Sequence, residues 1–154
     1  MHPNLSFEQA PPISVPFRFF LTAPLFGILA GLLLIWLGPE ALASRWSAGT
    51  LALTHLLSVG FLLQAMCGAL LQFIPVISGG NIWRPRLVAG VLHPLLIVAA
   101  LLLAGGFALS RPLWLLIAAS LFGVGLGSFL LIVGLALWRS PAQGPSIRIL
   151  RLAL

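Results

Sequence analysis

Residues 87–109 read LVAGVLHPLLIVAALLLAGGFAL, an apolar run in which His93 is the only ionisable side chain. A helix needs about 20 apolar residues to cross the hydrocarbon core of a bilayer, so this run predicts a transmembrane helix. Three similar runs lie at about 18–38, 50–77 and 113–138. Short connections separate the four runs. We therefore expect an all-α, polytopic membrane protein in which residues 17–139 form an antiparallel bundle of four transmembrane helices.

The composition agrees with a membrane protein. Of 154 residues, 60% are hydrophobic and 6% are charged, whereas soluble domains carry about 25% charged residues. The net charge is +6, but the arginines stand singly or in pairs between the apolar runs and form no basic patch. This distribution excludes a soluble domain and argues against nucleic acid as a partner. It predicts the lipid bilayer instead.

The arginines also predict how the chain is oriented, because cytoplasmic loops of membrane proteins are enriched in basic residues. The N-terminus, the second loop and the C-terminal segment would share one side of the membrane. That side carries six of the eight arginines: Arg18, Arg84, Arg86, Arg139, Arg148 and Arg151. The other side carries Arg45 and Arg111. We therefore expect both termini in the cytoplasm.

The two ends are expected to lie outside the spans. Residues 1–16 contain four prolines and predict a flexible tail. Ala41-Leu42-Ala43 resembles a signal-peptidase site, but no basic residue precedes Arg18 and the first apolar run is long, which argues against cleavage. Residues 140–154 predict either a short amphipathic helix on the membrane surface or the start of a further helix in a longer protein.

Two histidines lie within the predicted spans, where ionisable groups are functional candidates. His55 is near the start of the second span, and His93 is near the start of the third. Because these two helices are expected to run in opposite directions, the histidines would differ in depth by about 22 Å at 1.5 Å per residue. They therefore cannot be the two axial ligands of one haem within a single chain.

An apolar stripe follows His55 at helical spacing. Its members are Val59, Leu62, Met66, Ala69 and Phe73. The stripe suits a flat hydrophobic macrocycle, and it equally suits packing against a neighbouring helix with His55 hydrogen-bonded across the interface. Gln64 is expected on the opposite side with Gly60 and Gly68, two glycines that allow another helix to approach closely.

The segments THLLSVGF (residues 54–61) and GALLQFIPV (residues 68–76) resemble the second helix of bacterial membrane proteins related to haem–copper oxidase subunit I. The oxidase-like and NnrS-like members carry the most similar stretch. In the oxidases, a histidine near the outer start of this helix binds the low-spin haem. The resemblance therefore implies that His55 binds haem b in a bacterial inner membrane. It also implies a role in respiratory electron transfer or nitric oxide handling.

The resemblance covers only the N-terminal part of those proteins. Oxidases take the second haem ligand from a His-x-His pair on a later helix and hold copper with three further histidines. This sequence has none of these groups, so the resemblance does not extend to a complete oxidase or nitric oxide reductase. A larger membrane partner or a second copy would supply the sixth ligand. Alternatively, the iron is five-coordinate and open to a diatomic gas.

Other residues are assigned around these two histidines. Arg45, near the His55 end, is a candidate partner for a haem propionate. Arg84 and Arg86, near His93, would bind propionates or anionic lipid. His93 would form interfacial hydrogen bonds, bind a second haem, or contact protons or a quinol. Met66 lies about 16 Å deeper than His55 by helical rise, so it is expected to contact haem and not to ligate it.

Two alternatives contain no haem. A membrane subunit could pack against a larger respiratory or transport complex, or against a second copy, through small-xxx-small faces. These faces are Gly27 with Gly31 and Gly123 with Gly127. A small transporter or channel is less favoured, because the spans carry no intramembrane charge. Cys67 is the only cysteine, which excludes an intrachain disulfide, and it predicts a small buried hydrophobe.

Overall fold

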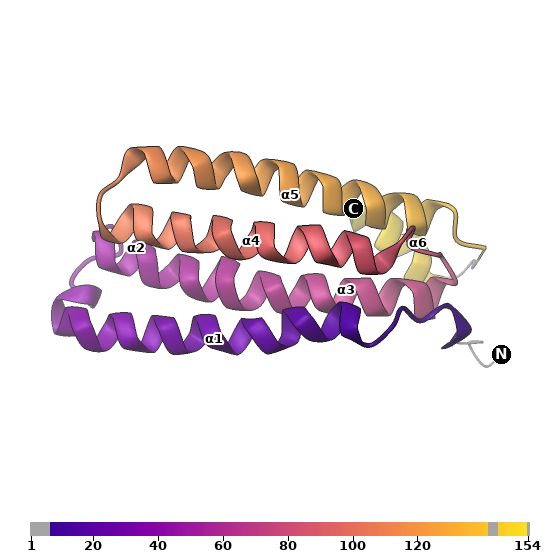
Figure 1. Ribbon diagram of the computed structural model, residues 1–154, viewed down its shortest axis with the longest axis horizontal. Coiled ribbons are helices and arrows are strands. Elements are labelled where there is room, and N and C mark those ends of the chain that lie inside the picture. Colours follow the sequence, from indigo (N-terminus) through magenta and orange to yellow (C-terminus); the bar gives the residue numbers. More distant parts are fainter. Residues whose placement is uncertain (1–6, 142–144, 154) are drawn as a thin grey trace.

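A computed structural model describes residues 7–141 and 145–153 of the chain. Four long helical segments lie side by side (Figure 1). The first is α1 (Ser14–Leu37), which continues into the 3-10 turn η2 (Gly38–Leu42). The second is formed by α2 (Ala48–His55), the π-helix η3 (Leu56–Leu62) and α3 (Leu63–Ser78). The third and fourth are α4 (Pro85–Ala108) and α5 (Pro112–Trp138).

Two short elements complete the described chain. The 3-10 turn η1 (Phe7–Gln9) precedes α1, and α6 (Pro145–Ala153) follows α5. No strand occurs in the described ranges. All four long segments have the length and hydropathy needed to cross a membrane. The expected all-α, multi-pass architecture is therefore confirmed at this level.

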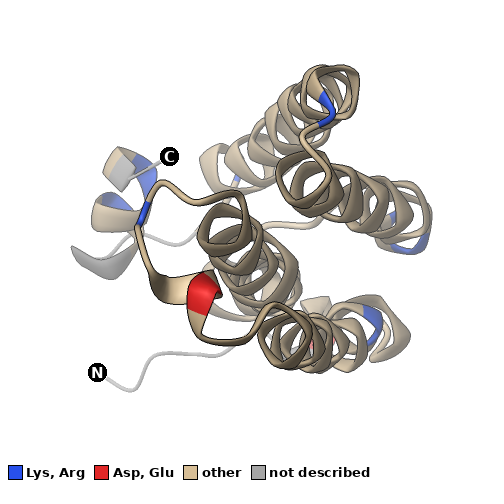
Figure 2. Ribbon diagram, turned by 90° about the vertical axis from the view of Figure 1, so that its left-hand side faces the viewer, with Lys and Arg blue, Asp and Glu red and all other residues tan. Residues whose placement is uncertain are grey.

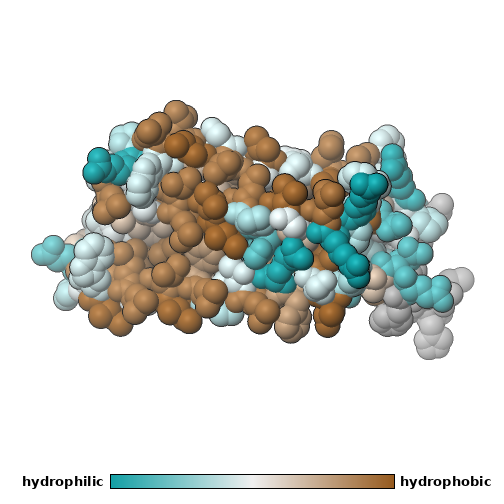
Figure 3. All heavy atoms as spheres, in the orientation of Figure 1, coloured by the Kyte–Doolittle hydropathy of each residue, from teal (hydrophilic) through white to brown (hydrophobic). Residues whose placement is uncertain are grey.

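The surface has the polarity of a membrane protein. Hydrophobic residues cover most of the length between two more hydrophilic ends (Figure 3). In an end-on view, the arginines are scattered over separate segments and do not gather into one patch (Figure 2).

Local signals explain where the helices begin and end. Ser47 caps α2 by accepting a hydrogen bond from the Thr50 backbone N–H at 3.2 Å. Pro85 and Pro112 begin α4 and α5, where a missing N–H leaves no internal bond unmade. Gly79 ends α3 in the left-handed conformation with φ 65°, which glycine adopts without strain.

The beginning of α1 differs from the expectation. The helix begins at Ser14, before the predicted residue 18, and Pro11 and Pro16 are buried against the rest of the chain. Pro16 is compatible with this early start because N–H groups in a first helical turn have no intrahelical partner. The predicted tail therefore already contains the turn η1 and the first residues of α1. Residues 1–6 lie outside the described part.

The contact between α1 and the second segment depends on two glycines. A Cβ atom on Gly60 would lie 2.3 Å from Cδ1 of Phe26, and one on Gly68 would lie 2.9 Å from Cβ of Phe19. Phe19 and Phe26 are both buried. The absence of side chains at these glycines lets the two helices approach closely, as the sequence predicted.

The second segment is not a regular α-helix throughout. The stripe below His55 was placed by assuming a constant turn of 100° per residue, and this assumption is wrong for residues 56–62. Residues 56–62 form a π-helix that ends with a bond from the Leu63 N–H to the Ser58 carbonyl. Nearby hydroxyls compete for backbone carbonyls: Thr54 Oγ1 donates to Thr50 O at 2.8 Å, and Ser58 Oγ donates to Thr54 O at 2.7 Å. Such π-helical turns are frequent at functional sites.

The C-terminal segment forms a helix beside the end of α5. Ile147 of α6 is buried. Arg151 donates from Nε to Leu137 O at 3.3 Å and from Nη2 to Ser140 O at 3.1 Å. Leu152 and Ile149 point away and are exposed. The helix is therefore attached to α5 through one side and presents apolar residues on the other.

Candidate functional site

His55 is the last residue of α2 and immediately precedes the π-helix η3. Its Nδ1 atom lies 2.6 Å from the carbonyl oxygen of Leu51, one turn earlier in the same helix. Its ring stacks on Phe107 of α4, with 4.7 Å between ring centroids and 24° between the planes. The side chain is half-buried. These two contacts fix both the position and the orientation of the imidazole.

The Leu51 contact also selects one form of the His55 ring. A carbonyl oxygen can only accept, so Nδ1 must carry the hydrogen and donate it. In the neutral ring, Nε2 then keeps its lone pair, and no described residue bonds to it. Histidines that bind metals commonly donate the other ring N–H to a backbone carbonyl in this way. His55 can therefore offer Nε2 to an iron atom.

An apolar cavity of about 250 Å³ lies between α1, η3 and α4, and Leu56, the residue after His55, is part of its lining. The lining residues are Leu29, Leu33, Leu56, Leu101, Ala104, Gly105 and Ala108. Pockets that enclose drug-sized ligands measure about 300–1,000 Å³. A macrocycle therefore cannot be enclosed here and would have to lie partly outside the chain.

The predicted stripe below His55 lies on the outside of the helices. Met66 is 51% exposed and Phe73 60% exposed, and Leu62 and Ala69 are exposed as well. Val59 is partly buried. The stripe therefore makes little contact with the rest of the chain and is open to lipid, a macrocycle or a second protein.

His93 of α4 has different neighbours. Its Nε2 atom lies 2.8 Å from Oγ1 of Thr22 on α1, and Phe19 meets its ring edge-on at 4.9 Å. The Thr22 hydroxyl donates its single hydrogen to Arg18 O at 2.8 Å, so it accepts from His93. His93 therefore donates from Nε2 and connects α4 to α1.

The two histidines are far apart, as the sequence predicted. His55 contacts α4 at Phe107, which is about 14 positions after His93. This spacing corresponds to about 21 Å along α4 at 1.5 Å per residue. No group of three or more His, Cys, Asp or Glu side chains able to hold a metal occurs among the described residues. At the His55 end, His55 is therefore not part of a ready-made cluster of metal ligands in the described chain.

The arginines assigned from the sequence lie in the connections. Arg45 is exposed and stacks over the Trp46 ring at 5.2 Å, and no described contact joins it to His55. Arg84 is also exposed and stacks over Trp83 at 4.9 Å. Arg86 is exposed in the first turn of α4.

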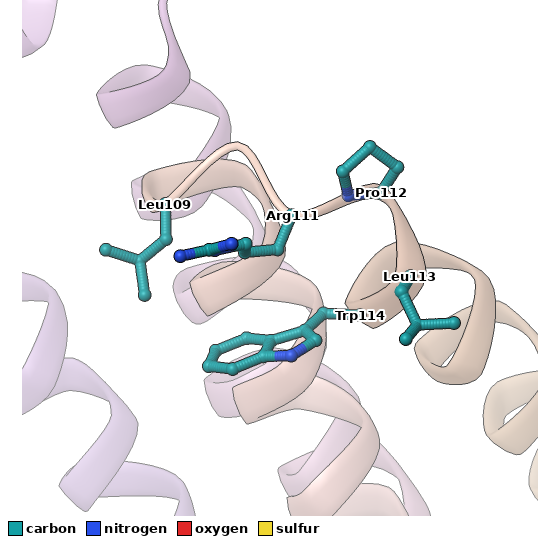
Figure 4. A pocket seen from close by; sticks show the side chains of 5 residues that line it. All are labelled: Leu109, Arg111, Pro112, Leu113 and Trp114. Atoms are coloured by element: carbon teal, nitrogen blue, oxygen red, sulfur yellow. The ribbon is translucent and has the colours of Figure 1, made fainter.

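Arg111 is a further candidate partner for an anionic group at the His55 end. From the sequence, it was used only to predict the orientation in the membrane. Its backbone N–H bonds to Gly106 O at 2.8 Å, which places it beside Phe107, the residue that stacks on His55. It lines an open cavity of about 390 Å³ with Leu109, Pro112, Leu113 and Trp114. Figure 4 shows Arg111, Leu109 and Trp114 pointing to one side of this turn. The sequence could have indicated this position, because the short Ser110-Arg111-Pro112 connection keeps Arg111 close to the ends of both α4 and α5.

Gln64 is the most unusual polar group within the spans. It is 0% exposed, and neither Oε1 nor Nε2 has a hydrogen-bond partner among the described residues. Its neighbours along the helix, Gly60 and Gly68, contact α1, so Gln64 is held in the same close contact. A buried amide without partners is unfavourable.

Replacement of Gln64 by Leu, which has a similar volume, is therefore expected to increase the free energy of unfolding by about 1–3 kcal/mol. Thermal unfolding in detergent, followed by tryptophan fluorescence, measures the change. Gln9→Leu is the control, because Gln9 is exposed and lies outside the spans. A Gln64→Leu variant that is clearly less stable than wild type would show that the amide has a partner, such as a bound water.

The described chain is thus helical, with four helices long and apolar enough to cross a membrane and with an Nε2 atom on His55 that bonds to no described residue. No protein-family model, curated protein or solved structure matches the chain. The likeness to oxidase subunit I therefore depends only on the residues quoted above for that resemblance.

Proposed function

We propose that the chain is a haem b-binding protein of a bacterial inner membrane, with His55 as an axial iron ligand. Its role would be in respiratory electron transfer or in the handling of nitric oxide. The observation that carries the proposal is the bond from His55 Nδ1 to Leu51 O, which leaves Nε2 free to bind iron. The bound haem would supply one-electron chemistry or a site for a diatomic gas.

The proposed arrangement is an antiparallel four-helix bundle with both termini in the cytoplasm. The contacts of Phe26 with Gly60 and of Phe19 with Gly68 support opposite directions for the first two segments. The excess of arginines at the end that carries the N-terminus supports the orientation. In this arrangement, His55 lies near the outer face of the membrane.

The chain's own residues would hold the haem from one side. His55 would bind the iron, and Val59, Leu62 and Met66 would contact the macrocycle on the exposed stripe. Arg111 or Arg45 would pair with a propionate. Because His93 is engaged by Thr22 and lies at the other end, the sixth ligand would come from a second copy or a larger membrane partner, or the position would stay open.

Visible absorption of the detergent-purified protein, expressed with ample haem, tests the proposal. We expect a b-type α band after reduction with dithionite and a Soret band that shifts when carbon monoxide is added, if the sixth position is open. A shift with carbon monoxide is not expected if a second copy fills that position. A colourless protein would overturn the haem proposal for this chain.

A second candidate function is a haem-free membrane subunit, and the open glycines favour it. Nothing lies within 4 Å of a Cβ placed on Gly31 of α1 or on Gly123, Gly127 and Gly134 of α5. These small residues thus remain available to another transmembrane helix. A colourless protein that co-purifies with a second membrane protein, and loses it on Gly127→Leu, would support this function.

A further inference from the structure

Arg18 lies within α1, and its side chain reaches across to the neighbouring helix α4. It belongs to the second turn of α1. A Cβ atom on Gly90 of α4 would lie 3.7 Å from its Nη1 atom, so the guanidinium rests against α4 at a position with no side chain. Its Nε donates to Ser14 O at 3.2 Å, which orients the group.

Arg86 lies one turn before Gly90 on α4, and residues four apart share a helix face. The two guanidinium groups therefore belong to the same surface, where α1 and α4 meet. In the view of Figure 3, hydrophilic residues reach from the end that carries the N-terminus into the hydrophobic surface. His93 and Thr22 lie one turn deeper and hold the two helices together through their 2.8 Å hydrogen bond.

Within the described part of the chain, no carboxylate pairs with these two charges. The chain has two acidic side chains, Glu8 and Glu40. Among the described residues, neither Arg18 nor Arg86 forms an ion pair, and Nη1 and Nη2 of Arg18 have no acceptor. Two cations on one surface without an anion favour a ligand that carries negative charge and several acceptor oxygens.

The surroundings indicate that this ligand also has an apolar part. Leu21, three residues after Arg18 on α1, is 63% exposed. Val91, which follows Gly90 on α4, is 60% exposed. Arg18 and Gly90 lie roughly 6–9 Å inside their helix ends at 1.5 Å per residue. This is the depth of lipid headgroups for helices that begin at the membrane surface.

We propose that Arg18 and Arg86 bind the phosphate of an anionic phospholipid on the surface between α1 and α4, with the lipid seated over Gly90. The lack of a side chain at Gly90 gives the phosphate and Arg18 room at this position. The Thr22–His93 hydrogen bond acts as a positioning contact, because it keeps α1 and α4 in register beneath the headgroup. The proposal does not depend on haem.

The test is lipid binding to the full chain in detergent, measured by native mass spectrometry with phosphatidylglycerol and with phosphatidylcholine as the zwitterionic comparison. We expect wild type to prefer phosphatidylglycerol. Arg18→Gln and Arg86→Gln should each weaken phosphatidylglycerol binding about five- to tenfold, with little change for phosphatidylcholine. Arg45→Gln is the matched control and should bind as wild type does.

Gly90→Leu provides a second variant that keeps both charges. A Cβ atom fits at this position at ordinary contact distance, so the fold should be retained, which circular dichroism checks. The longer side chain should cover the site and weaken phosphatidylglycerol binding at least fivefold. An excess of inorganic phosphate should not compete.

Three results would overturn the proposal. The first is an Arg18→Gln variant that folds and binds phosphatidylglycerol as tightly as wild type. The second is an equal loss of binding in Arg45→Gln, which would mean that any arginine attracts the lipid. The third is full competition by inorganic phosphate, which would identify a soluble anion as the ligand.

Discussion

The His55→Ala variant is expected to lose the α band of the reduced protein. Its haem content per chain should be at least tenfold lower than that of wild type. The substitution removes the only nitrogen near this end of the described chain that is free to bind iron. Alanine is the best helix former, so the junction of α2 and η3 should persist. Circular dichroism and the pyridine haemochrome assay, made on the same preparation, measure helix content and haem content.

His93→Ala is the matched control, because it also removes an imidazole from a membrane-spanning helix. Its Nε2 is engaged by Thr22, so its loss should leave the α band unchanged. Added imidazole should restore part of the band in His55→Gly, where the cavity left by the side chain can admit it. An α band that survives in His55→Ala and disappears in His93→Ala would move the iron ligand to the other end of the protein.

The four membrane-spanning segments could be predicted because their signal is local. An apolar run such as residues 87–109 must satisfy its backbone bonds internally in lipid, and helix formation achieves this without regard to neighbours. The depth difference between His55 and His93 was predictable for a related reason, since helical rise and short connections determine it. The contacts through Phe107 agree with the predicted value.

The partners of the two histidines were not predictable from spacing. Thr22 lies 71 positions from His93, and the contact exists because α1 and α4 are neighbours in space. The π-helix was missed because it depends on the competition of Thr54 and Ser58 hydroxyls for backbone carbonyls, which a hydropathy pattern does not contain. Apolar patterning also does not distinguish a face that contacts protein from one that contacts lipid, as the exposed Met66 illustrates.

Gly80→Ala should destabilise the fold more than a single methyl group suggests. Gly80 is buried in the connection between α3 and α4, and a Cβ atom there would lie 2.2 Å from the carbonyl oxygen of Ala136 on α5. That oxygen belongs to backbone, so no side-chain rotation can relieve the clash. The end of α5 would have to move and would separate the Ser140 hydroxyl from the Ser78 carbonyl to which it donates.

The free energy of unfolding is therefore expected to fall by about 3 kcal/mol, at the upper end of the range for overpacked sites. Thermal unfolding in detergent, read by tryptophan fluorescence, measures it. Gly127→Ala is the matched control, because nothing lies within 4 Å of its Cβ position and alanine favours the helix. That variant should be as stable as wild type or slightly more stable. If Gly80→Ala were as stable as wild type, the end of α5 would not pack against the α3–α4 connection. The described contact between Ser140 and Ser78 would then be wrong as well.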